Sequence, residues 1–381
     1  MFVEFMAYLR LALRCFSICS DRVLGHLSDA LYRTVDRITI KKKTPISIRQ
    51  INVKDRVGPS SVERYWDEHT VGFLPVVSGS EFRNTHQSMR HIAWRFRAYP
   101  LFARFMQLYG DCSGKVILDY GCGPGSDLVG FSLYSNPRKV VGIDVSMTAL
   151  EMAARRLELH GVDASRVELV NTPESLCTIP LPSDSVDLIH SCGVLQHASR
   201  PATILKEFFR VLKPGGHGNI MVYNRDSVWM HLYVAYVLQI LQGRFSEMSA
   251  NDAFSRSTDG AECPIARSYR PGRFTSMCHA AGFAAEYLGG YFALLELDLL
   301  RKHGNSAMRD PKLPDEHRQF ISSLVRDESG YPLYRGKPAG VGGVYRLRKP
   351  DGAQRIQSKT TSAWNHAKKP AAAKDWYKQR R

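Results

Sequence analysis

Hydrophobic residues in the middle of the chain form short runs that alternate with segments of helical spacing. Apolar runs typical of buried strands occupy residues 115–120, 139–145, 167–170, 185–192 and 218–223. Apolar positions three and four residues apart predict helices at 126–135, 148–160 and 201–212. This alternation predicts a mostly parallel sheet with helices on both of its faces.

The pattern changes after residue 223. Val228–Leu241 is apolar at nearly every position, but its 14 residues are too few to span a bilayer, so it predicts a buried helix, a lid or an interfacial helix. Residues 274–281 have helical spacing, 283–292 predict a sixth strand, and 342–349 have the composition of a last strand. Residues 293–338 are interrupted by prolines and predict an insertion.

Both ends of the chain are basic. The net charge is +16, of which residues 1–58 contribute +6 and residues 349–381 contribute +7, whereas 59–348 carry only +3. We therefore predict a basic amphipathic extension and linker (1–58), a main domain (59–348) and a basic disordered tail (349–381). Within the main domain, 114–223 would be the core and 224–338 a lid or substrate insertion.

Residues 1–39 have apolar positions at helical spacing and predict one or two amphipathic helices. Such helices either attach to a membrane surface or pack on the main domain or a protein partner, and the sparsely basic polar face favours packing. Apolar stretches near the start are broken by charges, and no run is long enough to span a bilayer. The eight cysteines form no CxxC pair and no zinc spacing, so we expect no metal site and a cytoplasmic location, with peripheral membrane attachment as an alternative.

The sharpest local signal is the sequence Asp-Tyr-Gly-Cys-Gly-Pro-Gly at 119–125, directly after a predicted strand. Glycines in a strand-to-helix turn let the backbone approach a ligand closely, because no Cβ intrudes. Asp144 ends the second strand, 19 residues after Gly125. A carboxylate in that position can accept both hydroxyls of a ribose, so the pair indicates a cofactor that contains adenosine.

The spacing of the glycines is GxGxG, since Ser126 stands where a dinucleotide site would have its third glycine. Asp119 precedes the first glycine by two residues, and a carboxylate there would repel a pyrophosphate. The same carboxylate suits a ligand with an ammonium and a sulfonium. These features favour S-adenosyl-L-methionine over NAD, and they disfavour an NAD-dependent oxidoreductase.

The segments VILDYGCGPG, VVGIDVS, LPSDSVDLIHSCGVLQH and EFFRVLKPGG occur in this order between residues 114 and 223. In this the sequence resembles the class I S-adenosylmethionine-dependent methyltransferases, in particular the small-molecule type similar to ubiquinone and menaquinone methyltransferases. The resemblance extends to YNRDSVWM, STDG and CPIAR within 223–267. It implies an α/β fold of three layers, with a Rossmann-like sheet of seven mostly parallel strands and the last strand antiparallel.

The resemblance also implies roles for single residues. The methionine part of the cofactor would be lined by Asp119, Gly121, Gly123 and Gly125. Asp144 would hold the ribose. The adenine would be flanked by Val145 and Ser146 and by the loop residues Glu174, Ser175 and Leu176. Cys192 would lie near the transferred methyl group. The sequence departs from the family where an Asp often binds the adenine amino group, because Thr172 stands there.

The candidates for a catalytic base are His197, His69 and Tyr223. His197 follows the fourth predicted strand, on the cofactor side of such a sheet, although a histidine there can also serve in capping or packing. His69 and Trp66 belong to an N-terminal segment that often closes over the cofactor in the family. The apolar stretch 228–241 predicts a small, apolar or aromatic acceptor, methylated on O, N or C.

Two other functions remain open from the sequence. The main domain carries only +3, which argues against a nucleic-acid methyltransferase, as does the lack of an Asn-Pro-Pro-aromatic motif. A non-catalytic binding or assembly protein that keeps the fold is the second alternative, because fold alone does not determine function.

Overall fold

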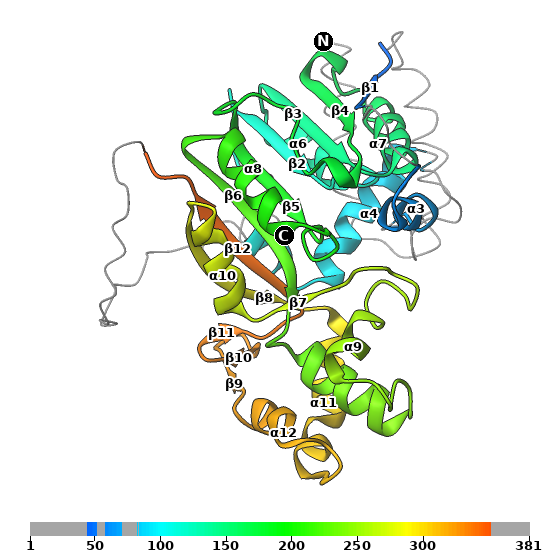
Figure 1. Cartoon of the computed structure of the whole chain (residues 1–381), viewed down its shortest axis with the longest axis vertical. Coiled ribbons are helices and arrows are strands. Elements are labelled where there is room, and N and C mark those ends of the chain that lie inside the picture. The colour runs from blue at the N-terminus through cyan, green and yellow to red at the C-terminus, as the bar shows by residue number, and fades with distance from the viewer. Residues whose placement is uncertain (1–43, 52–57, 71–81, 83, 352–381) are drawn as a thin grey trace. The chain divides into compact units, whose positions relative to one another are not determined.

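The computed structural model describes residues 44–51, 58–70, 82 and 84–351 of the 381-residue chain (Figure 1). The chain divides into two compact units, residues 1–350 and 351–381, and every element below belongs to the first. The helices expected within 1–39 and nearly all of the expected tail lie outside the described residues.

Nine strands form the main sheet. They are β1 (Ile48–Gln50), β2 (Val116–Tyr120), β3 (Lys139–Asp144), β4 (Val167–Asn171), β5 (Val186–Cys192), β6 (Leu212–Asn224), β7 (Ser268–Tyr269), β8 (Ala284–Tyr291) and β12 (Gly342–Arg348). Their order is β1-β4-β3-β2-β5-β6-β12-β8, and β7 pairs with β6. A separate small sheet contains β9 (Val325–Arg326), β10 (Pro332–Tyr334) and β11 (Lys337–Pro338).

The central strands β4, β3, β2, β5 and β6 pair in parallel, and β12 is antiparallel to both β6 and β8. The predicted α/β class, with a mostly parallel sheet and an antiparallel last strand, is confirmed. The expected number of seven strands is too low, because the short strands β1 and β7 add to it. A second difference concerns Lys213–Gly216, which we expected only to stop a helix but which belong to β6.

Helices cover both faces of the sheet. They are α3 (Ser61–Glu68), α4 (Thr85–Ala98), α5 (Phe102–Met106), α6 (Ser126–Tyr134), α7 (Met147–Leu159), α8 (Pro201–Val211), α9 (Ala250–Ser255), α10 (Pro271–Ala280), α11 (Leu294–Arg309) and α12 (Asp315–Ser322), with the short turns η1 (Ala164–Arg166) and η2 (Glu174–Leu176) and the wide π-type helix η3 (Trp229–Leu241). The predicted helices of the core therefore form, within a residue or two of their expected bounds.

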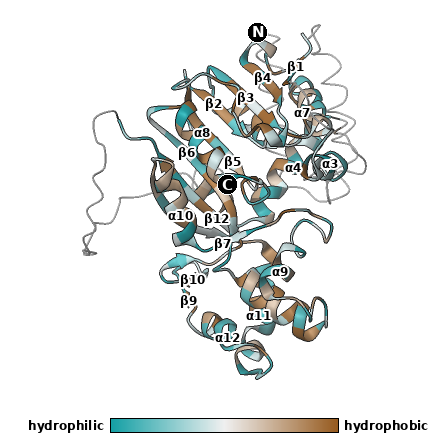
Figure 2. Ribbon diagram, viewed as in Figure 1, coloured by the Kyte–Doolittle hydropathy of each residue, from teal (hydrophilic) through white to brown (hydrophobic). Residues whose placement is uncertain are grey.

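Neighbouring residues of a strand pack in different hydrophobic cores, because side chains alternate between the two faces of a sheet. Leu118 packs in a cluster with Phe208 of α8 and Phe274 of α10, whereas Ile117 packs with Leu128 of α6 and Leu150 of α7. Much of β2, β3 and β4 is brown, the colour of hydrophobic residues, in Figure 2. Burial on both faces explains why the sequence shows continuous apolar runs there.

The residues after β6 build a third core outside the sheet. Apolar side chains of η3, α11 and α12 pack together there, among them Leu232, Leu299 and Phe320. The buried carboxylate of Glu296 ties this core to the sheet, because it accepts hydrogen bonds from the backbone N–H groups of Trp229, Ala293 and Val341 at 2.8–3.2 Å. The apolar stretch 228–241 is thus a buried helix, as one of our alternatives predicted. No helix in the described part of the chain is long and apolar enough to cross a membrane.

Candidate active site

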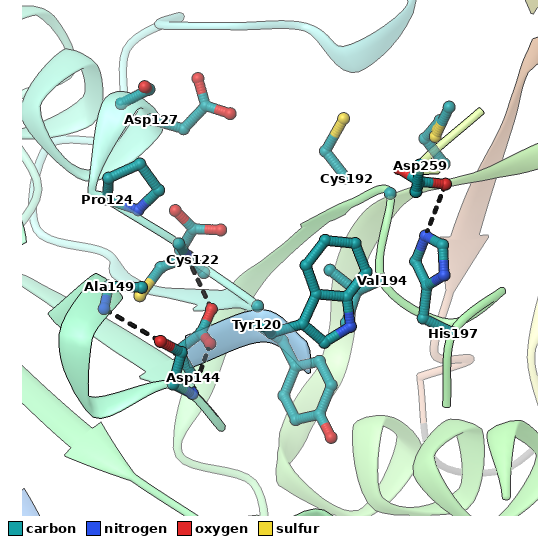
Figure 3. Close-up of a pocket in the computed structure, with 18 of the residues that line it drawn as sticks. Tyr120, Cys122, Pro124, Asp127, Asp144, Ala149, Cys192, Val194, His197 and Asp259 are labelled. Carbon is teal, nitrogen blue, oxygen red and sulfur yellow. Dashed lines mark hydrogen bonds and ion pairs between the residues drawn. The ribbon is translucent and has the colours of Figure 1, made fainter. Parts of the chain in front are cut away.

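A cavity of about 770 Å³ opens at the carboxyl ends of β2, β3, β5 and β6. The sequence-predicted residues that line it are Asp119, Gly121, Gly123, Asp144, Val145, Ser146, Glu174, Cys192, His197 and Tyr223. In the close-up of Figure 3, Asp144 and Cys122 lie on one side and His197 and Asp259 on the other. The carboxyl edge of a parallel sheet is where ligands bind in open α/β folds.

The three glycines of the turn after β2 have positive φ angles of +73°, +51° and +77°, a conformation that favours glycine. A Cβ on Gly121 would lie 2.2 Å from Val194 Cγ2, and one on Gly125 would lie 2.9 Å from Ala153 Cβ. A Cβ on Gly123 would meet no atom within 4 Å, so it would project into open space. Gly125 does not line the cavity, and its need for glycine comes from packing against α7.

Asp119 is 3% exposed, and its Oδ2 atom has no hydrogen-bond partner among the described residues. Burial raises the pKa of this carboxyl to about 7, and the neighbouring Asp127 and Asp144 act in the same direction, while His190 and Arg95 oppose them. A buried carboxylate without a partner is costly. It therefore suits a cationic group of a ligand.

Two backbone N–H groups hold the carboxylate of Asp144 in place, and one of them belongs to the glycine turn after β2. Its Oδ2 accepts a hydrogen bond from the Gly123 N–H at 2.7 Å, and its Oδ1 accepts one from the Ser146 N–H at 2.9 Å (Figure 3). Ser146 caps the N-terminus of α7 through Ala149 N–H and donates its hydroxyl to Asp67 of α3 at 2.6 Å. Burial raises the pKa of Asp144, and these backbone donors oppose that effect.

The loop after β4 brings only part of its predicted set to the cavity. Glu174 and the buried Thr172 line the cavity, but Ser175 and Leu176 do not. The carboxylate of Glu174 is engaged by the N–H of Ser199 at 2.9 Å and by the Ser199 hydroxyl. The difference arises because η2 is a single tight turn, so consecutive residues point in different directions.

Sequence reasoning missed a buried ionic cluster at the base of the cavity. Arg95 of α4 donates two hydrogen bonds to the carboxylate of Asp127 at 2.8 and 3.0 Å, and Tyr109 and His190 also bond to it at 2.9 and 3.0 Å. Burial alone would raise the pKa of Asp127, but Arg95 and His190 hold it well below the ordinary value. Arg95 stands between Trp94 and Phe96, and Arg97 follows two residues later, so cations that alternate with aromatic residues were the available signal.

Histidine, tyrosine and aspartate meet at the opposite end of the cavity. The Tyr223 hydroxyl donates to Asp259 Oδ2 at 2.7 Å, and His197 Nε2 lies 3.5 Å from the same oxygen. His197 Nδ1 lies 2.6 Å from the carbonyl oxygen of Ile265. Asp259, which sequence reasoning did not single out, belongs to the STDG segment. Atoms of His197, Asp259 and Cys263 lie within 4.8 Å of one another, a set of metal-ligand types among the described residues.

The structure does not bring His69 into the site. His69 follows α3, is exposed, and uses Nδ1 to contact the carbonyl oxygen of Tyr65 at 3.0 Å. Trp66, three residues earlier, does line the cavity, and its ring lies 4.9 Å from the His197 ring, edge to face. Residues three apart share a face of a regular helix, but His69 is the C-cap of α3, where the backbone is no longer helical (φ −118°, ψ 59°). Its ring stacks on Tyr65 with the ring centroids 4.3 Å apart, so it does not follow Trp66 into the cavity.

These residues fit S-adenosylmethionine. The unpartnered Asp119 carboxylate suits an ammonium, the space beside Gly123 admits a ligand that no Cβ obstructs, and Asp144 stands at the tip of β3. When bound, this cofactor supplies an electrophilic methyl group on a sulfonium, and the protein contributes orientation and exclusion of water.

Comparison with known proteins agrees with this site. Residues 118–219 match the family described as "Methyltransferase domain". Together with the fold and the site, this match identifies the segment as a class I S-adenosylmethionine-dependent methyltransferase domain, so the predicted family and cofactor are confirmed.

Individual relatives overlap the chain to different extents. A 37.1 kDa protein in transposon TN4556 of Streptomyces fradiae is 42% identical over 27% of this chain and 28% of its own length. The ubiquinone biosynthesis O-methyltransferase of Thiobacillus denitrificans is 26% identical over 60% of this chain and 81% of its own. The solved structure of the YcgJ protein from Bacillus subtilis aligns with 66% of this chain and 98% of its own, at 17% identity and a TM-score of 0.42. This chain spans only 28–41% of the length of the first relatives it matches, so these overlaps do not identify the acceptor.

Proposed function

We propose that this protein transfers a methyl group from S-adenosylmethionine to a small, apolar or aromatic metabolite. The observation that carries the proposal is a single cavity with two chemically different ends. One end holds the glycine turn, Asp119 and Asp144. The other end, around His197 and Asp259, has aromatic rings in its walls, including Trp66, Tyr223 and Trp229. An apolar, planar acceptor would fit such walls better than a free sugar.

Within this proposal, each predicted residue that lines the cavity has a role. Asp119, Gly121 and Gly123 bind the methionine part, Asp144 binds the ribose, and Val145 with Ser146 borders the adenine. The Glu174 loop borders the adenine from the other side, and Cys192 lies near the methyl group. Tyr223 and His197 act on the acceptor.

We also propose that the segment 224–338 is a lid that shapes the acceptor end. Support comes from Trp229, Ala293 and Val341, which line the cavity while their N–H groups are bound by Glu296. A buried carboxylate with three backbone donors holds the lid and the last strand in one arrangement. The six cysteines of the described residues are free thiols, which is consistent with the cytoplasmic location that we propose.

Calorimetry with S-adenosylhomocysteine tests the cofactor end. Asp144→Ala should weaken binding at least tenfold, because it removes the proposed ribose partner. Gly123→Val should abolish binding, because its side chain fills the open space. Gly330→Val is the matched control, since Gly330 also has a positive φ (+84°) and no atom within 4 Å of a Cβ, but lies outside the cavity. Unchanged affinity in both cavity variants would refute the assignment of the site.

Turnover tests the acceptor end. Radiolabelled S-adenosylmethionine is incubated with a panel of apolar phenols and quinols and with matched sugars and amino acids. We expect label in the apolar acceptors. Preferential labelling of the polar group would contradict the proposal even if the cofactor binds as expected.

A further inference from the structure

The two polar groups at the acceptor end face each other in an unusual way. A carbonyl oxygen can only accept a hydrogen bond, so the 2.6 Å contact with Ile265 places the hydrogen of a neutral His197 ring on Nδ1. The lone pair of Nε2 then points toward Asp259 Oδ2 at 3.5 Å. Two acceptor atoms at this distance repel each other unless a hydrogen or a cation lies between them.

Tyr223 does not remove this conflict. Its hydroxyl donates to Asp259 Oδ2 at 2.7 Å and so fixes that carboxylate, but it offers no hydrogen to Nε2. Both His197 and Asp259 line the cavity, with side-chain exposures of 6% and 14%. The missing hydrogen can therefore come from a molecule in the cavity.

We propose that His197 and Asp259 form a proton-accepting pair for an acceptor with a phenolic or enolic hydroxyl, which this protein methylates on oxygen. This inference rests on the proposed function and names the substrate class of the same site. The acceptor O–H bond breaks, its electron pair stays on oxygen, and the proton moves to His197 Nε2. That oxygen forms the new bond to the methyl carbon donated by S-adenosylmethionine, and the pair of the broken C–S bond stays on sulfur. The proton then leaves to water.

The surroundings of His197 suit this role. Burial lowers the pKa of the imidazole, so the ring is neutral near neutral pH and its Nε2 is free to accept a proton, while Asp259 and the Ile265 carbonyl oppose that shift and stabilise the charged form. Arg267 acts in the same direction as burial. The other groups around the ring are Trp66, Tyr223 and the thiol of Cys263, which lies 3.7 Å from Nδ1.

The site is less suited to an amine acceptor. A free amine is largely an ammonium at neutral pH, and the carboxylate of Asp259 would favour that charged form, which has no lone pair to methylate. A phenol or enol is neutral before transfer and must lose its proton, which the pair can take. The aromatic walls would bind a phenol and an aromatic amine equally well, but the carboxylate of Asp259 favours methylation of the phenol.

The first test needs no acceptor. The full chain, labelled with ¹⁵N-histidine and saturated with S-adenosylhomocysteine, is titrated by NMR. We expect a neutral His197 with its hydrogen on Nδ1, and a pKa about one unit lower in Asp259→Asn than in wild type, because the variant loses the stabilising carboxylate. His279→Gln is the control: it removes an exposed histidine of α10, so the signals of His279 should disappear and the pKa of His197 should stay unchanged. A neutral ring protonated on Nε2, or an equal His197 pKa in wild type and Asp259→Asn, would overturn the proposal.

The second test uses 4-nitrophenol, whose phenolate absorbs visible light, at a pH well below the pKa of the free phenol, so that the unbound compound is almost entirely neutral. Wild type with S-adenosylhomocysteine should bind it as the phenolate, and His197→Gln should reduce that absorption at least tenfold. Methylation of benzylamine in preference to 4-nitrophenol, or binding of the phenol without ionisation, would refute the pair as a proton acceptor. If these variants bind S-adenosylhomocysteine with the affinity of wild type in calorimetry, such a result contradicts only the proton-accepting pair and not the proposed function.

A bound cation is the competing occupant. Cobalt(II) added to the full chain would give an intense thiolate band if His197, Asp259 and Cys263 held a metal, and Cys263→Ser would abolish it. We expect no such band and equal activity with and without EDTA. A thiolate band from one cobalt ion per protein chain would show that a metal ion, and not a proton, lies between His197 and Asp259, and it would overturn the proposal.

Discussion

Binding of the cofactor should depend on pH through Asp119. Burial raises the pKa of this carboxyl to about 7 in the absence of ligand. The cationic end of the ligand favours the ionised carboxylate, so below that pKa a proton must leave before the ligand binds. Affinity should therefore be constant above about pH 8 and should weaken as the pH falls through 7.

The magnitude follows from the fraction of Asp119 that is ionised. Well below the pKa, each unit of pH lowers that fraction tenfold, which corresponds to about 1.4 kcal/mol of binding free energy. Between pH 8 and pH 5.5 the dissociation constant of S-adenosylhomocysteine should rise roughly thirtyfold. Binding at pH 6 should also release close to one proton.

Calorimetry measures both quantities. Titrations at pH 5.5–8.5 give the dissociation constant, and titrations at pH 6 in two buffers with different ionisation enthalpies give the number of protons released. Asp119→Asn should bind more weakly at high pH and show a flat profile, which separates Asp119 from the nearby His190. A flat profile in wild type, or the same slope in Asp119→Asn, would refute this account of Asp119.

Three further predictions concern stability. Gly121→Ala should lower the free energy of unfolding in urea by about 1–3 kcal/mol, because its Cβ would lie 2.2 Å from a Val194 methyl carbon. Gly123→Ala should lower it by only about 1 kcal/mol through backbone strain, and its main effect should be weaker cofactor binding in calorimetry. Arg95→Met should cost about 3–5 kcal/mol, since it leaves the Asp127 carboxylate buried with one fewer cation; a loss under 1 kcal/mol would contradict this. Glu296→Ala should cost about 3 kcal/mol or more in the same urea assay because three buried N–H groups lose their acceptor, and an unchanged unfolding midpoint would count against its role in the lid.

The sequence by itself determined the order of the core elements between residues 114 and 223 and most of the cofactor end of the site. Strands that are covered on both faces of a sheet are apolar at nearly every position, so runs such as 139–145 can be recognised in the sequence by their composition and length. The glycine turn and Asp144 are local features, because positive φ angles and the residue at the tip of a strand depend on adjacent positions. For this reason Asp119, Gly121, Gly123 and Asp144 could be predicted to lie together.

Only the tertiary structure decided the acceptor end. Asp259 is 62 residues from His197 and 36 from Tyr223, and nothing local relates these positions, so their meeting at one oxygen depends on how the lid packs on the sheet. The same holds for Arg95 and Asp127, which come from α4 and α6. His69 and Trp66 looked equivalent in sequence, but the backbone leaves the helical conformation at His69, the C-cap of α3, and its ring stacks on Tyr65, so Trp66 alone reaches the cavity.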